Sequence, residues 1–181
     1  MSIFDKLKNA AASAIDKQEV TITFNNLPES VEEMKALPEA SLDTPFKAAA
    51  LTLCALCAYA ADHEIGTAML NFLRGPRPLS GADIQFLNAR FLEGATYLPF
   101  SYFAGATPEN DYTPSKPFKV TVYTDTYTYA NEGYARLNIR SGGADSPRQV
   151  TLRKTADGKW MLWEQFLLVG IRKPKSQDPW A

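Results

Sequence analysis

His63 is the only histidine in the 181-residue chain, so any chemistry that needs an imidazole must use this ring. A histidine-rich metal site is therefore excluded, and a serine or cysteine triad would depend on His63 alone. The ring lies between Asp62 and Glu64 at the expected start of a helix, off its apolar stripe. Two interpretations stay open: an exposed residue of the first helical turn, or a general base or metal ligand.

Cys54 and Cys57 form the one CxxC pair of the sequence. A redox dithiol needs a helix N-terminus, where the dipole lowers the thiol pKa, and a structural zinc site needs a second pair of ligands. Both cysteines fall instead within the apolar segment AALTLCALCAYAA. They are better interpreted as small residues of a buried core.

The segment 101–117, SYFAGATPENDYTPSKP, has no hydrophobic period. Long aperiodic segments of compact domains are often binding or lid segments. Here Glu109, Asn110 and Asp111 stand beside Tyr112, and three neighbouring acceptors suit a hard cation, although the alternating ligands and turn glycine of an EF-hand-like loop are missing. The alternative is an Ω-type loop whose Asx side chains bond its own backbone.

The segment 140–148, RSGGADSPR, places small residues between Arg140 and Arg148. Free backbone amides between two arginines resemble an anion cradle, but the trailing Gly-Lys-Ser/Thr of a phosphate loop is absent. A plain connection between two strands explains the same residues without a ligand. Residues 74–78, RGPRP, add two more arginines, and an anionic ligand becomes credible if the fold brings these loops together.

Aromatic and basic residues share the outward face of the expected strands: Tyr123, Tyr134, Arg136, Arg140 and Arg153. Such a face can stack bases, as sheet-based RNA binders do. The net charge of −1 and the absence of an RNP-type motif count against this, so we predict no nucleic-acid partner. A solvated or partner-covered sheet face is the ordinary alternative.

Trp160 and Trp163 fall on opposite faces of one expected strand. One of them can belong to the core while the other lies in a pocket or an interface with Glu164 and Gln165. Tryptophan is enriched at interfaces because it combines a large apolar area with a polar N–H.

The first half of the chain must position these groups with helices. Apolar residues at helical spacing predict helices that begin at Thr44, Asp62 and Ser80, each of which supplies an N-cap side chain. The first of the three is apolar nearly all round and is expected to be the central buried helix. Ahead of them, VTITF at 20–24 predicts a strand, and residues 29–36 predict a short acidic helix.

The second half changes to a two-residue period. Apolar and polar residues alternate in residues 118–123, 134–140 and 150–153. After a hairpin turn at Asp157-Gly158, residues 159–168 predict a fourth strand that is apolar on both faces. Four strands most simply form an antiparallel meander with one face packed on the helices.

Composition predicts a soluble globular protein, with 45% hydrophobic and 22% charged residues. Residues 1–62 hold five Lys and nine Asp or Glu, whereas residues 147–181 hold seven Lys or Arg and three Asp or Glu. The two ends can attract one another within the fold or a dimer, or the basic end can take an anionic or acidic partner. No signal-peptide pattern is present and the longest apolar run has 14 residues, so we expect a cytoplasmic protein.

Residues 1–18 predict an amphipathic helical arm, whose apolar stripe is Ile3, Phe4, Leu7, Ala11 and Ile15. The arm could dock on its own domain, on a partner or on an anionic membrane surface. The stripe is short and rich in alanine, which makes membrane contact the less favoured of these.

Several segments resemble a family of uncharacterised bacterial proteins of the kind seen in clostridia. They are RGPRPLS (74–80), SYFAGATPENDYTP (101–114), NEGYA (131–135), RSGGADSPRQV (140–150), KWMLWEQF (159–166) and DPWA (178–181). The opening IFDKLKNAA is similar to leader helices of many small bacterial cytosolic proteins. The family has no assigned activity, so the resemblance implies a bacterial cytosolic origin and no functional residues.

Together these features predict an α+β fold, with N-terminal helices packed on a C-terminal antiparallel sheet of about four strands. By analogy the sheet is cone-shaped, as in nuclear-transport-factor-like folds. The arm at 1–18 precedes a single domain at 19–172 and a surface tail at 173–181.

The predicted function is a non-catalytic protein-binding or scaffold module, acting on a protein partner or as a homo-oligomer, with no metal and no cofactor. The alternative is a small-molecule (anionic ligand) binding protein or an enzyme with a pocket between sheet and helices. The candidate ligand-binding residues are Tyr102, Asn110, Asp111, Tyr112, Arg140, Arg148 and Trp163.

Overall fold

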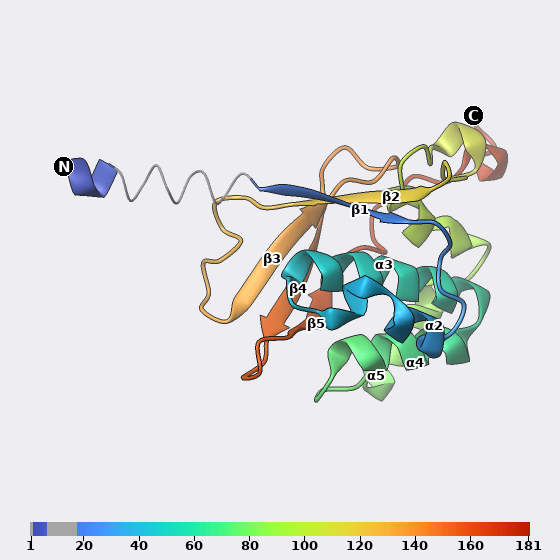
Figure 1. Cartoon of the computed structure of the whole chain (residues 1–181). Coiled ribbons are helices and arrows are strands. Elements are labelled where there is room, and N and C mark those ends of the chain that lie inside the picture. The colour runs from blue at the N-terminus through green and yellow to red at the C-terminus, as the bar shows by residue number, and fades with distance from the viewer. Residues whose placement is uncertain (1, 7–17) are drawn as a thin grey trace.

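A computed structural model describes residues 2–6 and 18–181 of the chain. Its elements form one open antiparallel sheet with the helices gathered on one side, an α+β fold as predicted (Figure 1). The predicted arm at residues 1–18 falls largely outside the described residues. Within them, Ile3 and Phe4 are exposed. No helix in the described part of the chain is long and apolar enough to span a bilayer.

Each long helix begins at the side chain that the sequence predicted as its cap. α3 (Pro45–Ala61) follows Thr44, α4 (His63–Arg74) follows Asp62, and α5 (Gly81–Arg90) follows Ser80; in all three the cap side chain accepts a backbone N–H of the first turn. The short helix α2 (Val31–Ala36) starts in the same way at Ser30.

The sheet has five strands rather than the predicted four, and their order in space follows the chain. They are β1 (Glu19–Phe24), β2 (Phe118–Tyr123), β3 (Tyr134–Ile139), β4 (Arg148–Lys154) and β5 (Trp160–Gln165). The additional strand is the segment that VTITF predicted. This strand, β1, pairs with β2, and Val20 lies opposite Val122. In the sequence the whole helical half of the chain separates the two strands. The alternation of apolar and polar residues identifies a strand, but it does not indicate which distant strand pairs with it.

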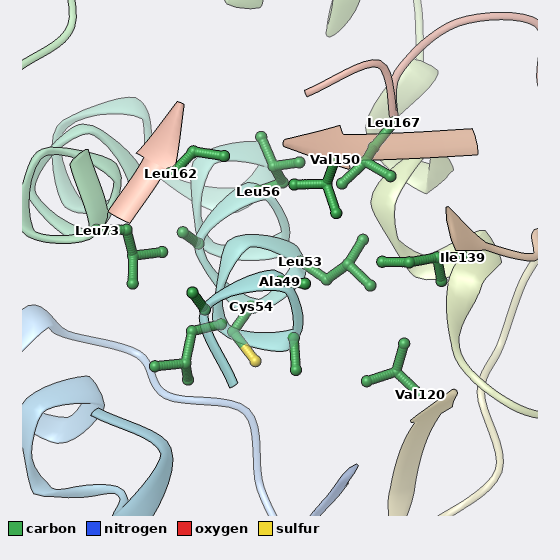
Figure 2. Close-up of a cluster of buried hydrophobic side chains, with 14 of the residues drawn as sticks. Ala49, Leu53, Cys54, Leu56, Leu73, Val120, Ile139, Val150, Leu162 and Leu167 are labelled. Carbon is green, nitrogen blue, oxygen red and sulfur yellow. The ribbon is translucent and has the colours of Figure 1, made fainter. Parts of the chain in front are cut away.

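α3 is the central helix of the core, as its uniform apolar character predicted. Thirteen of its residues are buried, and it packs against both α4 and the inner face of the sheet. Figure 2 shows Leu53 and Leu56 of α3 among Ile139, Val150 and Leu162 of the strands. Burying this apolar surface is the main stabilising contribution of the fold.

The sheet divides where β2 meets β3, because only Val122 and Tyr123 pair with the neighbouring strand. The segment after α5 fills this division. Ala104 N–H donates to the Lys119 carbonyl at 2.9 Å, and Gly142 N–H donates to the Ser101 carbonyl at 2.8 Å. The first residues of the aperiodic segment 101–117 are therefore hydrogen-bonded between β2 and the connection that follows β3.

Candidate functional site

β5 carries an irregularity that determines what its outer face presents. Leu162 pairs with Leu152 and Glu164 pairs with Thr151, so Trp163 between them has no paired residue in β4. Such a bulge adds one residue to a strand and redirects its side chains. Trp163 and Glu164 consequently both contribute to the outer face, and Trp163 lies at the edge of the sheet beside the connection between α4 and α5.

Two arginines and a tyrosine surround the Trp163 ring. The guanidinium carbon of Arg77 lies 3.8 Å from the ring centroid and that of Arg153 lies 4.8 Å from it. The Tyr134 ring meets Trp163 edge-on, with 5.6 Å between centroids. Guanidinium–aromatic stacking is favourable and leaves the N–H groups at the guanidinium edge available to further acceptors.

Arg77 reaches β5 from the connection between α4 and α5. The Arg74 side chain holds this connection, donating from Nε to the Arg77 carbonyl at 2.9 Å and pairing with Asp83 at 3.5 Å. Burial alone would raise the pKa of the Asp83 carboxyl, but hydrogen bonds from Ser80 and the charges of Arg74 and Arg77 lower it overall. Arg77 itself donates to the Trp163 carbonyl, which satisfies an edge-strand acceptor.

The same outer face continues across the sheet with two more stacked pairs. Arg136 lies over Tyr127 at 5.9 Å and Arg140 lies over Tyr123 at 5.1 Å. We define the aromatic–arginine face as Tyr123, Tyr127, Tyr134 and Trp163 with Arg77, Arg136, Arg140 and Arg153.

Two hollows adjoin Trp163. A cavity of about 430 Å³ lies between β5 and helices α4 and α5, lined by Leu70, Arg74, Arg77, Leu87 and Trp163 among others. A hollow of about 560 Å³ lies on the outer face, lined by Tyr127, Tyr134, Arg136, Thr151, Trp163 and Glu164 among others. Trp163 is thus shared by a pocket between sheet and helices and by the aromatic–arginine face.

The predicted site residues of segment 101–117 make contacts within the protein. The buried Tyr102 hydroxyl donates to the Leu167 carbonyl at 2.6 Å. Asn110 donates to the Gly105 carbonyl and accepts from Thr107 N–H, as in the Ω-type alternative. Asp111 accepts from the Ser176 hydroxyl.

Tyr112 is the fourth residue of this group and is almost fully buried. Its hydroxyl donates to the Arg172 carbonyl at 2.6 Å, and its ring stacks on Tyr97. Of the predicted site residues, Tyr102 and Arg140 share a hollow of about 440 Å³. Trp163 lies apart from that hollow and lines the two described above.

Because the Tyr112 phenol is buried, we predict that the protein loses stability at alkaline pH. Burial raises the pKa of its phenol to about 12, with a further contribution from Tyr97. The folded protein therefore holds this proton more tightly than the unfolded chain, whose tyrosines titrate near pH ~10. The free energy of unfolding should stay level below pH ~10 and fall as the pH rises toward about 12.

The measurement is chemical denaturation at a series of alkaline pH values. Tyr112→Phe has no phenol to titrate, so its stability should fall less steeply over the same window. A residual slope is expected, because burial also raises the pKa of Tyr102. Identical slopes for the two proteins would show that Tyr112 contributes nothing.

The 140–148 connection uses its donors internally. Arg148 donates to the carbonyls of Val169 and Gly170, each at 2.7 Å. Gly143 N–H donates to the Ser141 hydroxyl at 3.1 Å. The amides and the guanidinium that suggested an anion cradle are thereby engaged with the protein itself.

The remaining reactive groups are placed as the simpler interpretations expected. Cys54 and Cys57 are free and buried, and burial raises the pKa of both thiols. His63 lies exposed in the first turn of α4 with its ring stacked on Tyr59 at 4.5 Å. Within residues 2–6 and 18–181, no group of three His, Cys, Asp or Glu is arranged to hold a metal ion.

Three members of the aromatic–arginine face were not among the residues predicted for that face: Arg77, Tyr127 and Trp163, of which Trp163 was predicted for a pocket or an interface. Arg77 was visible within RGPRP, but its contact with Trp163 joins positions that lie far apart in the sequence. Tyr127 lies in the connection between β2 and β3, where no alternation indicates a face.

These features define a class of protein: an α+β domain with an open sheet whose outer face stacks arginines on aromatic rings. The chain belongs to the DUF6935 family, a domain of unknown function whose model matches residues 26–175. The match confirms membership of an uncharacterised family and includes the helices, not only residues 74–181. No curated protein and no solved structure matches the chain, so the likeness to nuclear-transport-factor-like folds stays a prediction.

Proposed function

We propose that this domain is a non-catalytic module that binds another protein through the aromatic–arginine face. The observation that carries the proposal is Trp163, displaced outward by the bulge of β5 and surrounded by Arg77, Arg153 and Tyr134. Tryptophan, tyrosine and arginine are the residues most enriched among the energetic hot spots of protein interfaces.

The charges on this face support the proposal. In the described part of the chain, ion pairs within 4 Å join Lys47 to Asp43, Arg74 to Asp83, Arg172 to Asp145 and Lys175 to Glu109. None of them includes an arginine of the aromatic–arginine face. The four arginines of the aromatic–arginine face are held in place by stacking on aromatic rings. Their remaining N–H donors can bind a partner.

A small anionic ligand in the cavity beside α4 and α5 is the second candidate. Its favourable feature is a largely apolar hollow of about 430 Å³ with Arg74 and Arg77 in its wall. Arg74, however, already serves Asp83 and the Arg77 carbonyl. The aromatic–arginine face is therefore the better-supported binding site of the two.

The proposal includes the finer expectations from the sequence, a bacterial cytoplasmic module with a protein partner or a second copy of itself. The resemblance to clostridial proteins supports the bacterial origin. The two free cysteines are compatible with a reducing compartment.

The test is capture of partners from a native bacterial lysate by the immobilised domain, with quantification by mass spectrometry. Trp163→Ala should lower capture of the specific partner at least about tenfold, because truncating a hot-spot tryptophan costs about 2 kcal/mol or more. Trp180→Ala is the matched control, since Trp180 is 93% exposed in the C-terminal tail and absent from the face.

Thermal unfolding of each variant confirms that the compared proteins are folded. Equal capture by the wild type and both variants would reject the aromatic–arginine face as the docking surface. A bound small molecule in place of a protein partner would favour the cavity beside α4 and α5.

A further inference from the structure

Arg136 lines the hollow on the outer face. It lies opposite Thr151 of β4, which in turn lies opposite Glu164 of β5. These three residues form a row across three strands, so about 10 Å separates the backbones at its two ends. Trp163 and Tyr134 flank the row, and all five residues line the hollow of about 560 Å³.

The Arg136 guanidinium carries an unusual defect. Its Nε–H is buried and has no hydrogen-bond partner, and it is the one such side-chain atom among the described residues. Leaving a buried donor unpaired is destabilising, and more so when the donor belongs to a charged group. Native structures contain few such groups, so each one needs a physical explanation.

The neighbouring acceptors do not remove this defect. The Thr128 carbonyl accepts from the backbone N–H of Arg136. The Asp125 carboxylate accepts from Asn138 at 2.8 Å and from Tyr127 N–H at 2.7 Å. Glu164 stands at the far end of the row and forms no ion pair with Arg136 within 4 Å. The hollow thus contains a guanidinium whose Nε–H has no acceptor within the protein.

We propose that this hollow binds a carboxylate of the partner, an Asp or Glu side chain of an acidic peptide segment, on the Nε–H and Nη–H groups of Arg136. The inference rests on the proposed function, since it names the chemistry that the aromatic–arginine face recognises. A carboxylate accepts two parallel N–H bonds from one guanidinium edge, which satisfies the buried donor and neutralises its charge. The Tyr127 ring lies beside the Arg136 guanidinium and is 65% exposed, so few contacts oppose its displacement by the incoming group.

The composition of the face favours a peptide carboxylate over a nucleic-acid backbone. Glu164 forms the opposite wall of the hollow, and Glu19 lies at the other edge of the sheet, beside Arg140. Closely spaced phosphates would meet both carboxylates, and the chain as a whole carries a net charge of −1. An isolated carboxylate beside Arg136 avoids this repulsion, while aromatic rings on either side pack against the apolar part of the peptide.

The experiment follows the Arg136 Nε–H directly by ¹H–¹⁵N NMR of the full chain during titration. The probes are N-acetyl-glutamate α-amide at millimolar concentration and its neutral isostere, N-acetyl-glutamine α-amide. The glutamate probe should shift the Arg136 signal saturably and the glutamine probe should not. Arg90 is the internal reference, because it also lies over an aromatic ring, Phe86, but on α5 away from the face.

A second arm uses a capped peptide with one glutamate between leucine residues and three proteins: wild type, Arg136→Lys and Arg90→Lys. Lysine keeps the charge and removes the planar pair of donors, so Arg136→Lys should weaken peptide binding about tenfold and Arg90→Lys should leave it unchanged. A peptide that binds no more tightly than the single-residue probe would identify a small carboxylate, not a peptide, as the ligand and would overturn the peptide assignment.

Three results would overturn the inference. They are an unchanged Arg136 signal with the glutamate probe, equal peptide affinity in the wild type and Arg136→Lys, or tighter binding of oligo-uridylate than of the single-glutamate peptide. Capture of a protein partner that depends on Trp163 but not on Arg136 would leave the proposed function standing and remove only the carboxylate assignment.

Discussion

Gly66→Ala should unfold this protein or make it insoluble, although alanine is the better helix former. A methyl group at position 66 would lie 2.2 Å from the Tyr59 Cα and 2.4 Å from its Cβ. Helices α3 and α4 pack against each other at this glycine, and the atoms in the way belong to or adjoin the backbone, so they cannot rotate aside. Helix propensity contributes about 1 kcal/mol in favour of alanine. Overpacking of a core costs about 1–3 kcal/mol, and more where the clash is with backbone atoms that cannot move, so the steric cost exceeds the gain in helix propensity.

The measurement is urea denaturation, or soluble yield where the variant does not fold. Gly81→Ala is the matched control, because Gly81 begins α5 and a methyl group added there would meet no atom within 4 Å. That substitution should leave stability unchanged or raise it by up to about 1 kcal/mol. Equal stability of Gly66→Ala and the wild type would mean that α3 and α4 do not pack in this way.

Leu53→Ala should lower the free energy of unfolding by about 3 kcal/mol or more. Leu53 is completely buried in α3, and its side chain lies between the helix and the strands, near Ile139 (Figure 2). Removing it takes away apolar surface burial and leaves a cavity that the strands on one side and α3 itself on the other can fill only in part. The loss should appear as a lower urea midpoint with an unchanged slope.

Leu92→Ala makes the same chemical change at a residue that is 64% exposed, between α5 and the segment that follows it. Its effect should stay within about 0.5 kcal/mol. If the two leucine variants lost equal stability, the contact between α3 and the sheet would not be the centre of the core.

The two kinds of prediction concern different parts of the molecule. Gly66 and Leu53 test the helix–sheet body, whereas Trp163 and Arg136 test the outer face of the sheet. Because distant sites without shared partners contribute nearly additively to stability, the outer face can be altered without affecting the core. A binding defect in a fully stable Trp163 or Arg136 variant would therefore report on recognition.

The helical half could be predicted from the sequence because its signals are local. Thr44, Asp62 and Ser80 cap helices through hydrogen bonds to residues two or three positions later. The same holds for the alternation that predicted the strands and set Trp163 on the opposite face from Trp160. Each of these features depends on backbone geometry within a few residues.

The aromatic–arginine face could be predicted only in part. Alternation identified Tyr134, Arg136 and Arg153 as outward residues, but the bulge in β5 depends on how two strands align and moves Glu164 to the outer face. Arg77 reaches Trp163 across 86 residues of chain. The candidate residues of segment 101–117 were predicted to face a ligand, but they are hydrogen-bonded within the protein. Their polar groups bond to residues 60 or 65 positions away, or within the loop itself.

The amino-acid sequence alone was enough to predict which segments become helices and strands. It also showed that the chain carries few kinds of reactive residue. Tertiary packing was needed to establish that β1 joins the sheet, that Tyr102 bonds inward, and that Arg136 is left without an acceptor. The reason is physical: propensity and capping act between near neighbours. Whether a polar group is satisfied depends on every group that folding brings within hydrogen-bond distance.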